Sequence, residues 1–261
     1  MAIKKPIDFY KINIDYIKEL HTHDSQVYFR NSSNYSNKPY IGIIIEADSY
    51  NYFIPLTSRK QKHANLKNTG PDYALIYEYV YRKELVANDV AVLKDKSPIN
   101  DDKKDIMKKI LSMLDYKKAV PVPKGEFQKI SIINDPNRDL LSKEYGFLLP
   151  KSDKIHEKAL KIINKQKTTG RIIHNHCNFS LLENVCRNWA LNKMSITALS
   201  PEITVKVNHQ VDISSLVLIS NGHLVKDDIN TSTVGEYEYI ISSETEFGDK
   251  KNVNILVKVI K

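Results

Sequence analysis

The sequence predicts an α+β protein followed by a small all-β module, and three observations support this fold class. Runs of β-branched and aromatic residues, typical of strands, dominate residues 40 to 93. From Asp135 to about Asn192, apolar residues recur at helical spacing. After Lys193 the chain returns to short strand-like runs separated by turn-rich pieces. We therefore predict two domains, residues 1–194 and 195–261, with a boundary near "SITALSP".

The N-terminal half is predicted to be mostly strands. "DFYKINIDYIKEL" is typical of a short strand that turns into a helix. "YIGIIIEADSYNYFIPLTS" contains two β-prone runs joined by "ADSYN", which predicts a hairpin. Further strands are expected in "YALIYEYVY", "VAVL" and "YKKAVPV", whereas the charged stretch "KDKSPINDDKKD" predicts an exposed loop.

Three helices are predicted downstream, in "NDPNRDLLSKEYGFLL", in "SDKIHEKALKIINKQK" and after "RIIHNHCNF". Ser152 stands where an N-cap residue of the second helix is expected. Ser180 and Glu183 have the S-x-x-E spacing of a capping box, which predicts that they open the last helix.

Composition indicates a globular protein of the cytoplasm. Hydrophobic residues make up 41% of the 261 residues and charged residues 27%. The longest apolar runs are a few residues long, which is too short to cross a membrane, and "MAIKKPIDFY" lacks the apolar core of a signal peptide. The two cysteines, Cys177 and Cys186, are too few for a disulfide framework.

The charge is distributed unevenly along the chain. From Ser195 onward there are six Lys against nine Asp and Glu, a net charge of −3, and because the whole chain carries +8 the first 194 residues carry +11. A positive body of this kind is expected to bind a polyanion, and RNA is a good candidate. The alternative is a lysine-rich surface that is simply solvated.

Candidate functional groups concentrate in "YFIPLTSRKQKH", where a β-prone run ends in two hydroxyls and several cations. A hydroxyl can donate hydrogen bonds to a phosphate, and a nearby lysine can stabilise the charge that develops there. Attack of an RNA 2′-hydroxyl on the adjacent phosphate needs correct positioning of the two groups, stabilisation of the developing charge, and proton transfer. Side chains of these types can supply all three. A strand end that enters a basic loop is the alternative reading. The residues concerned are Thr57, Ser58, Arg59, Lys60, Lys62 and His63.

Four segments in order resemble the ToxN/AbiQ family, the endoribonuclease toxins of type III toxin–antitoxin systems. They are "FYKINIDYIKEL", "KPYIGIIIEADSYNYFIPLTSRKQKH", "RDLLSKEYGFLLPKSDKIHEKALKI" and "CNFSLLENVCRNW", and together they cover roughly residues 8 to 192. The resemblance implies a compact fold around a strongly twisted antiparallel sheet, similar to the Kid/MazF toxins. It also implies metal-independent cleavage without a cofactor, which leaves a 2′,3′-cyclic phosphate. The implied partner is an antitoxin RNA of tandem pseudoknots, bound in a closed ring of alternating protein and RNA.

The resemblance also implies roles for individual residues. The family's active-site hydroxyls fall on Thr57 and Ser58 and its catalytic lysine on Lys60. Lys38 aligns directly with a family lysine and is expected to assist, whereas Tyr35 aligns with a family tyrosine after a shift of one residue. His63 matches a family histidine and is expected to transfer a proton. The residues expected to contact RNA are Tyr35, Lys38, Arg59 and Lys62.

The sequence departs from the family in two places and extends beyond it in a third. Arg59 replaces a frequent proline, and residues 80–105 look longer than the corresponding family stretch. The C-terminal "INTSTVGEYEYIISSETEFGDKKNVNILVKVI" resembles bacterial immunoglobulin-like modules.

The run "HNHC" contains three residues of types that bind zinc, His174, His176 and Cys177. No second cluster supplies a convincing fourth ligand, so we predict no metal site. Among the fifteen tyrosines, many of which are expected to be half-buried strand residues, only Tyr35 is expected to contact RNA. We therefore predict an endoribonuclease toxin that acts on cellular or phage RNA in growth arrest and abortive infection, with no membrane partner. Two other classes remain open: an RNA-binding module that cuts nothing, and an adhesion protein suggested by the tail alone.

Overall fold

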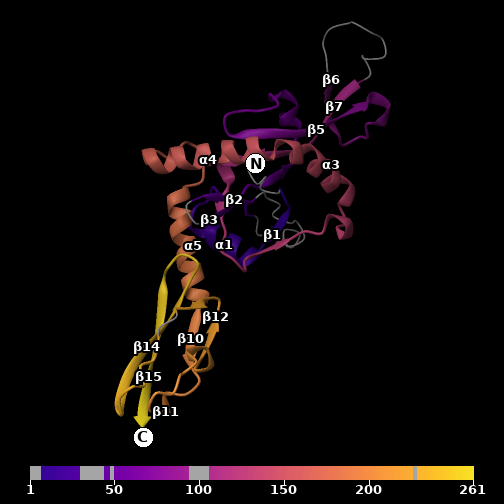
Figure 1. Cartoon of the computed structure of the whole chain (residues 1–261). Coiled ribbons are helices and arrows are strands. Elements are labelled where there is room, and N and C mark those ends of the chain that lie inside the picture. The colour runs from indigo at the N-terminus through magenta and orange to yellow at the C-terminus, as the bar shows by residue number, and fades with distance from the viewer. Residues whose placement is uncertain (1–6, 30–43, 48–49, 94–105, 226–227) are drawn as a thin grey trace. The chain divides into compact units, whose positions relative to one another are not determined.

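The computed structural model describes residues 7–29, 44–47, 50–93, 106–225 and 228–261 (Figure 1). The chain divides into two compact units. The first consists of residues up to Val122 together with Glu126–Glu183, and the second of Pro123–Gly125 together with Asn184–Lys261. None of the helices in the described ranges combines the length and apolar composition that a membrane crossing requires. The predicted domain boundary at residue 194 stays a prediction.

Within its described residues, the first unit contains antiparallel strands and three complete helices. Its strands are β1 (Tyr10–Ile12), β2 (Ile44–Ala47), β3 (Tyr50–Phe53), β4 (Leu56–Ser58), β5 (Tyr73–Tyr81), β6 (Val90–Leu93), β7 (Ile106–Asp115), β8 (Val120–Pro121) and β9 (Phe127–Lys129). Its helices are α1 (Ile14–His23), α3 (Arg138–Leu148) and α4 (Ser152–Thr169), and α5 (Phe179–Lys193) begins in it. Short 3-10 turns lie at η1 (Gln61–Asn65), η2 (Arg82–Glu84), η3 (Tyr116–Lys118), η4 (Ile132–Asn134) and η5 (Leu149–Lys151).

Three antiparallel sheets form the body of this unit. β1 pairs with β9, β2 and β8 flank β3, and β7 lies between β4 and β5 with β6 also on β7. The hairpin predicted for "IIEADSYNYF" is confirmed, because Ile44–Ala47 pairs with Tyr50–Phe53. The run "YFIPLTS", however, is not one strand: it breaks at Ile54 and Pro55, and β4 leaves the sheet of β3 to join that of β7. Proline has no backbone N–H to donate, which explains the break.

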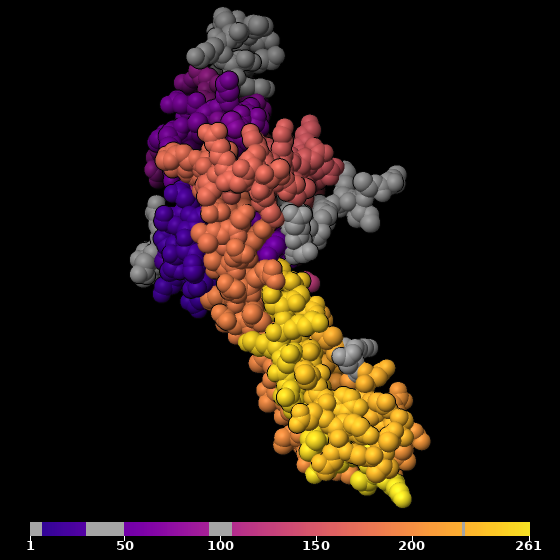
Figure 2. All heavy atoms as spheres, turned by 90° about the vertical axis from the view of Figure 1, so that its left-hand side faces the viewer, coloured from indigo at the N-terminus to yellow at the C-terminus, as the bar shows by residue number. Residues whose placement is uncertain are grey.

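A buried apolar core holds the sheets against the helices. Tyr16, Ile17 and Leu20 of α1 are fully buried, as are Tyr52 and Phe53 of β3. The Tyr52 ring packs edge-on against Phe179 at the start of α5, with ring centroids 5.9 Å apart. In Figure 2 the salmon and orange side chains of α4 and the start of α5 form one band beside the indigo N-terminal segment.

Two predicted helix starts were wrong. The N-cap of α4 is Lys151, and Ser152 is already the first helical residue. The capping residue of α5 is Asn178, whose Oδ1 accepts a hydrogen bond from Leu181 N at 3.2 Å. Glu183 does not turn back to the helix start; instead it accepts hydrogen bonds from Tyr52 Oη and Lys167 Nζ, both at 2.8 Å.

The second unit is built from two sheets around its own apolar cluster. β10 (Ser195–Ala198) pairs with β12 (Val217–Ser220), and the second sheet has the order β11 (Glu202–Lys206), β15 (Lys250–Ile260), β14 (Gly235–Glu244), β13 (His223–Leu224). All pairs are antiparallel except β11 with β15. A 3-10 turn, η6 (Ile213–Ser215), completes it. The buried cluster consists of Ile213, Val217, Ile241, Ile255, Val257 and Val259. Beyond Met194 the described residues form strands and one 3-10 turn, which agrees with the predicted all-β character. The likenesses to MazF and to immunoglobulin-like modules stay predictions.

Candidate active site

The two hydroxyl residues at the end of β4 face opposite sides of their sheet. Thr57 lies opposite Met113 of β7, and Ser58 lies opposite Ser112. Because successive side chains on a strand point to opposite faces, Thr57 and Ser58 diverge. Thr57 Oγ1 donates a long hydrogen bond of 3.4 Å to Met113 O, so its hydroxyl is held only weakly. The predicted hydroxyl pair thus lines two different pockets.

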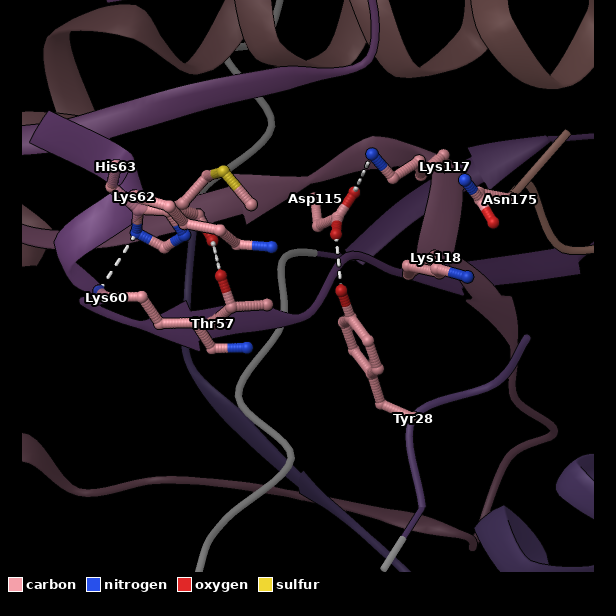
Figure 3. A pocket seen from close by; sticks show the side chains of 10 residues that line it. Tyr28, Thr57, Lys60, Lys62, His63, Asp115, Lys117, Lys118 and Asn175 are labelled. Atoms are coloured by element: carbon pink, nitrogen blue, oxygen red, sulfur yellow. Dashed lines mark hydrogen bonds and ion pairs between the residues drawn. The ribbon is translucent and has the colours of Figure 1, made fainter. Parts of the chain in front are cut away.

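Thr57 opens into a pocket of about 260 Å³ that we call the lysine pocket (Figure 3). Thr57, Lys60 and Lys62 lie on one side of it, and Tyr28, Asp115 and the lysines of η3 lie on the other. Its lining residues are Tyr28, Thr57, Lys60, Lys62, His63, Met113, Asp115, Lys117, Lys118 and Asn175.

Four lysines make this pocket strongly cationic. Lys60 and Lys62 are exposed and form no ion pair with any described side chain, so their charges are available to a ligand. Lys117 is partly neutralised, because its Nζ lies 3.2 Å from Asp72 Oδ2 and 3.7 Å from Asp115 Oδ1. The Lys118 ammonium is buried and donates to Gln26 Oε1 at 2.6 Å, and burial lowers its pKa. An anion with several oxygens is the ligand that this set of donors fits.

Asp115 and Tyr28 form a buried polar pair at the wall of the lysine pocket. Tyr28 Oη donates to Asp115 Oδ2 at 2.6 Å. Burial raises the pKa of Asp115, while Tyr28, Lys117 and Lys118 oppose that shift. Burial and the carboxylate together also raise the pKa of Tyr28, so the phenol keeps its proton at neutral pH. Tyr28 can therefore donate a hydrogen bond, but it does not act as a phenolate.

His63 is buried beneath the loop that carries the two exposed lysines. Its backbone N–H donates to Lys60 O at 2.8 Å, and the backbone N–H of Lys60 donates to His63 Nδ1 at 3.3 Å. Burial lowers the pKa of His63, and Lys60 and Lys62 lower it further, so the ring is neutral near pH 7. Since Nδ1 accepts a hydrogen bond, the neutral ring carries its proton on Nε2. This arrangement fixes the backbone of Lys60 relative to η1.

Ser58 faces a second pocket, of about 500 Å³, which we call the α3 pocket. It lies between helix α3 and the sheet face formed by β4 and β7. Arg59 lines it too, but its guanidinium is held by Asp89, with Nη2 3.6 Å from Asp89 Oδ1, and its Nε donates to Asn88 O. The lining residues are Leu56, Thr57, Ser58, Arg59, Asn88, Leu111, Ser112, Asn137, Leu140, Leu141 and Glu144.

The structure therefore divides the residues predicted for the site. Thr57, Lys60, Lys62 and His63 meet in the lysine pocket, whereas Ser58 and Arg59 line the α3 pocket and Thr57 borders both. Tyr35 and Lys38 lie outside the described residues. The far wall of the lysine pocket was not predicted from the sequence. It consists of Tyr28, Asp115, Lys117, Lys118 and Asn175. The "DYKK" run was the one available signal for part of it.

The residues of the "HNHC" run do not form a zinc-binding cluster with other described residues. His176 is buried with Nε2 3.5 Å from Asp72 Oδ2, and burial raises the pKa of the Cys177 thiol. Among the described residues, His, Cys, Asp and Glu side chains form no group of three that could hold a metal ion.

Comparison with known proteins gives a family for residues 8–187, which match the profile described as toxin ToxN of a type III toxin–antitoxin system. Endoribonuclease ToxN of Bacillus thuringiensis subsp. kurstaki is 26% identical over 201 residues, which cover 72% of this chain and 87% of the relative. Endoribonuclease ToxN of Pectobacterium atrosepticum is 29% identical over 188 residues, with coverages of 69% and 92%. The names of these relatives confirm the predicted enzyme class.

Two solved structures share the fold. One is AbiQ, a lactococcal anti-phage endoribonuclease of a type III system, with 18% identity, a TM-score of 0.51 and coverage of 72% of this chain and 99% of that chain. The other comes from work on selective toxin inhibition by a non-coding RNA pseudoknot, with 24% identity, a TM-score of 0.50 and coverages of 71% and 98%. The profile match spans well over half of the sequence. The chain therefore belongs to the ToxN toxin family of type III toxin–antitoxin systems.

Proposed function

We propose that this protein cleaves RNA without a metal ion, by attack of a 2′-hydroxyl oxygen on the adjacent phosphorus. The attack breaks the P–O5′ bond, leaves a 2′,3′-cyclic phosphate, and releases a 5′-hydroxyl end that takes up a proton as the 2′-hydroxyl loses one. The observation that carries the proposal is the lysine pocket, where Thr57 meets two exposed lysines, Lys60 and Lys62, that form no ion pair with a described side chain. Lysine charges and hydroxyl donors can stabilise a pentavalent phosphorane, which carries more negative charge than the ground-state phosphodiester. Asp115, the carboxylate of this pocket, is occupied by Tyr28 and Lys117.

The free edge of β4 is the position that fits the scissile phosphate. Within the described part of the chain, β4 pairs with β7 and its other edge carries no strand. A phosphate against that edge would be reached by Thr57 from one face and by Ser58 from the other. In this position the phosphate would contact both predicted hydroxyls, although their side chains point to opposite faces of the sheet.

The cations and His63 take different roles in this proposal. Lys60 stabilises the developing charge, and Lys62 binds the RNA backbone beside it. His63 acts as a positioning residue, because its neutral ring holds the Lys60 backbone through Nδ1. The sequence predicts proton transfer by His63, whereas a buried neutral ring with a bonded Nδ1 favours the positioning role. Lys38 and Tyr35 remain predicted contributors from outside the described residues.

We also propose that a pseudoknot RNA restrains the toxin and that its release leads to growth arrest or abortive infection. The support is the family membership, the relative solved in work on inhibition by a non-coding RNA pseudoknot, and the charge of +11 on residues 1–194. When lysine and arginine side chains contact RNA, the cations condensed on the RNA are released, and this release favours binding of the protein to the RNA.

A cleavage assay tests the proposal and separates it from a non-catalytic RNA-binding module. We expect the full-length protein to cut RNA in excess EDTA and to leave 2′,3′-cyclic phosphate ends, identified because phosphatase removes the phosphate only after acid has opened the ring. Binding without new ends would favour the RNA-binding module. Cleavage that stops on chelation and returns with Mg²⁺ would contradict the metal-free mechanism.

A further inference from the structure

The α3 pocket is built by one face of a helix and one face of a sheet. Asn137, Leu140, Leu141 and Glu144 stand at spacings of three, four and seven residues, which places them on one side of α3. Lys143 fixes this helix to the sheet, because its Nζ lies 2.8 Å from Glu78 Oε2 on β5.

The sheet side of the α3 pocket depends on an extra residue in β7. The pairing of β5 with β7 shifts between Ile76, opposite Ser112, and Tyr77, opposite Ile110, so that Leu111 is inserted. Such a bulge brings two consecutive side chains toward one face. Leu111 and Ser112 consequently line the same pocket, and Ser58, opposite Ser112, stands beside them.

Two polar groups of this pocket, the Ser112 hydroxyl and the Glu144 carboxyl, are buried side by side among its apolar walls. Ser112 is 3% exposed, and its Oγ forms no well-aligned hydrogen bond with a described residue. Glu144 is also 3% exposed, and burial raises the pKa of its carboxyl to about 7, with the nearby Ser112 hydroxyl opposing that shift. Buried polar groups in folded proteins normally have full hydrogen-bond partners, so the Ser112 hydroxyl beside a buried carboxyl indicates a polar ligand group in this pocket.

The chemistry of the pocket excludes a phosphate and fits a nucleobase. A buried carboxyl repels an anion, and Arg59, the other charged side chain in its lining, is engaged by Asp89. The remaining walls are apolar and consist of Leu56, Leu111, Leu140 and Leu141. Apolar walls accommodate the faces of a base, while a carboxyl accepts hydrogen bonds from an amino group on its edge.

The α3 pocket also lies at the right place for a base next to the cleaved bond. Thr57 borders both pockets, and Ser58 of the α3 pocket is the next residue on the edge strand. We propose that the α3 pocket binds an unpaired nucleobase with an exocyclic amino group, on a nucleotide that flanks the scissile phosphate, and that Glu144 accepts a hydrogen bond from that amino group. The inference rests on the proposed ribonuclease function and adds a determinant of sequence preference to it.

The test compares cleavage preferences on a randomised RNA library at pH 8. At that pH the Glu144 carboxyl, with its pKa near 7, is ionised and only accepts hydrogen bonds. Adenine, cytosine and guanine offer an exocyclic amino group, whereas uracil has none, and two carbonyl oxygens that the carboxylate repels flank its N3–H donor. We expect the full-length protein to disfavour uridine at one position beside the cut by roughly 10- to 100-fold.

Glu144→Gln, whose amide both donates and accepts, should reduce that discrimination to a few-fold while cyclic-phosphate ends still form. Glu157→Gln on the exposed face of α4 is the matched control and should keep the wild-type preference. Ser112→Ala removes a buried hydroxyl that forms no well-aligned hydrogen bond with a described residue, so it should fold normally and also weaken the preference. It covers the case in which Glu144→Gln misfolds.

Each outcome decides a different claim. An unchanged preference in folded Glu144→Gln and Ser112→Ala proteins that still cut RNA would overturn the base pocket. An absence of uridine discrimination in the wild type would do the same. A wild-type protein that cuts none of the library contradicts the proposed ribonuclease itself, which is a separate result.

Discussion

Thr57 and Ser58 are neighbours in the sequence but serve two faces of the molecule. A phosphate on the free edge of β4 would touch both, and a transition-state donor of this kind contributes on the order of 10²-fold to the rate or more. We therefore predict that Thr57→Ala and Ser58→Ala each lower RNA cleavage by about that factor and relieve growth inhibition. The rates should be measured on proteins whose circular dichroism matches that of the wild type.

A split result would be informative. If folded Ser58→Ala remains as toxic as the wild type while Thr57→Ala is inactive, the scissile phosphate lies inside the lysine pocket and Ser58 belongs only to the α3 pocket. Arg82→Gln, an exposed change in η2 away from both pockets, provides a control for loss of positive charge.

The buried carboxyl of Glu144 makes stability depend on pH. Its pKa rises from 4.5 to about 7 on folding, so the acid is protonated in both states below pH 4.5 and ionised in both above pH 7. The cost of burying the charge grows across this window and reaches up to about 3 kcal/mol at its upper end. We predict that the melting temperature of Glu144→Gln rises relative to that of the wild type as the pH is raised from 4.5 to 8. Glu157→Gln should show no such trend.

At the scale of elements, the start of α5 shows which of two candidate residues caps the helix. Asn178 caps the helix through Leu181 N, whereas Ser180 is exposed one residue inside it. We predict that Asn178→Ala costs about 1 kcal/mol and that Ser180→Ala costs almost nothing. Amide exchange of Leu181 should become several-fold faster in the first variant alone. Equal acceleration in both would contradict the assignment of the cap.

The elements differ in how far the sequence could predict them. The β2–β3 hairpin and helices α1, α3, α4 and α5 follow from local patterns, so they were predictable. β7 was not predicted, because "IMKKILSMLD" is rich in Leu, Met and Lys, which favour helices, and only pairing on both sides makes it a strand. Four of the ten residues that line the lysine pocket come from β7 and η3, so the same long-range pairing hid Asp115, Lys117 and Lys118. The local run from Thr57 to His63 was visible because its residues are adjacent.

At the scale of the whole molecule, charge separates the two predicted domains. The +11 of residues 1–194 and the −3 of residues 195–261 lead us to predict that RNA binding belongs to the first part and weakens steeply with salt. A chain shortened after Lys193 should still cut RNA and still be silenced by its antitoxin. A shortened protein that folds but no longer binds RNA would place part of the recognition surface in the tail.

The end of α5 is the structural risk in that experiment. Within the second unit, Arg187 forms a bidentate pair with Asp249: Nε donates to Oδ2 at 3.0 Å and Nη2 donates to Oδ1 at 2.6 Å. Lys251 Nζ donates to Met194 O at 2.6 Å. The shortened chain loses both contacts. Circular dichroism and solubility distinguish a melted helix end from a lost binding surface.

The open edge of β4 has a consequence for controlling this toxin by means other than RNA. Among the described residues the strand leaves one row of backbone groups without a neighbouring strand, and an extended peptide can add to such a row as a new strand. The peptide would occupy the proposed place of the phosphate without carrying charge, and its alternating side chains would point into the lysine pocket and the α3 pocket in turn. A protein inhibitor made in this way would compete with RNA at the cleavage step, yet its affinity would be nearly insensitive to salt.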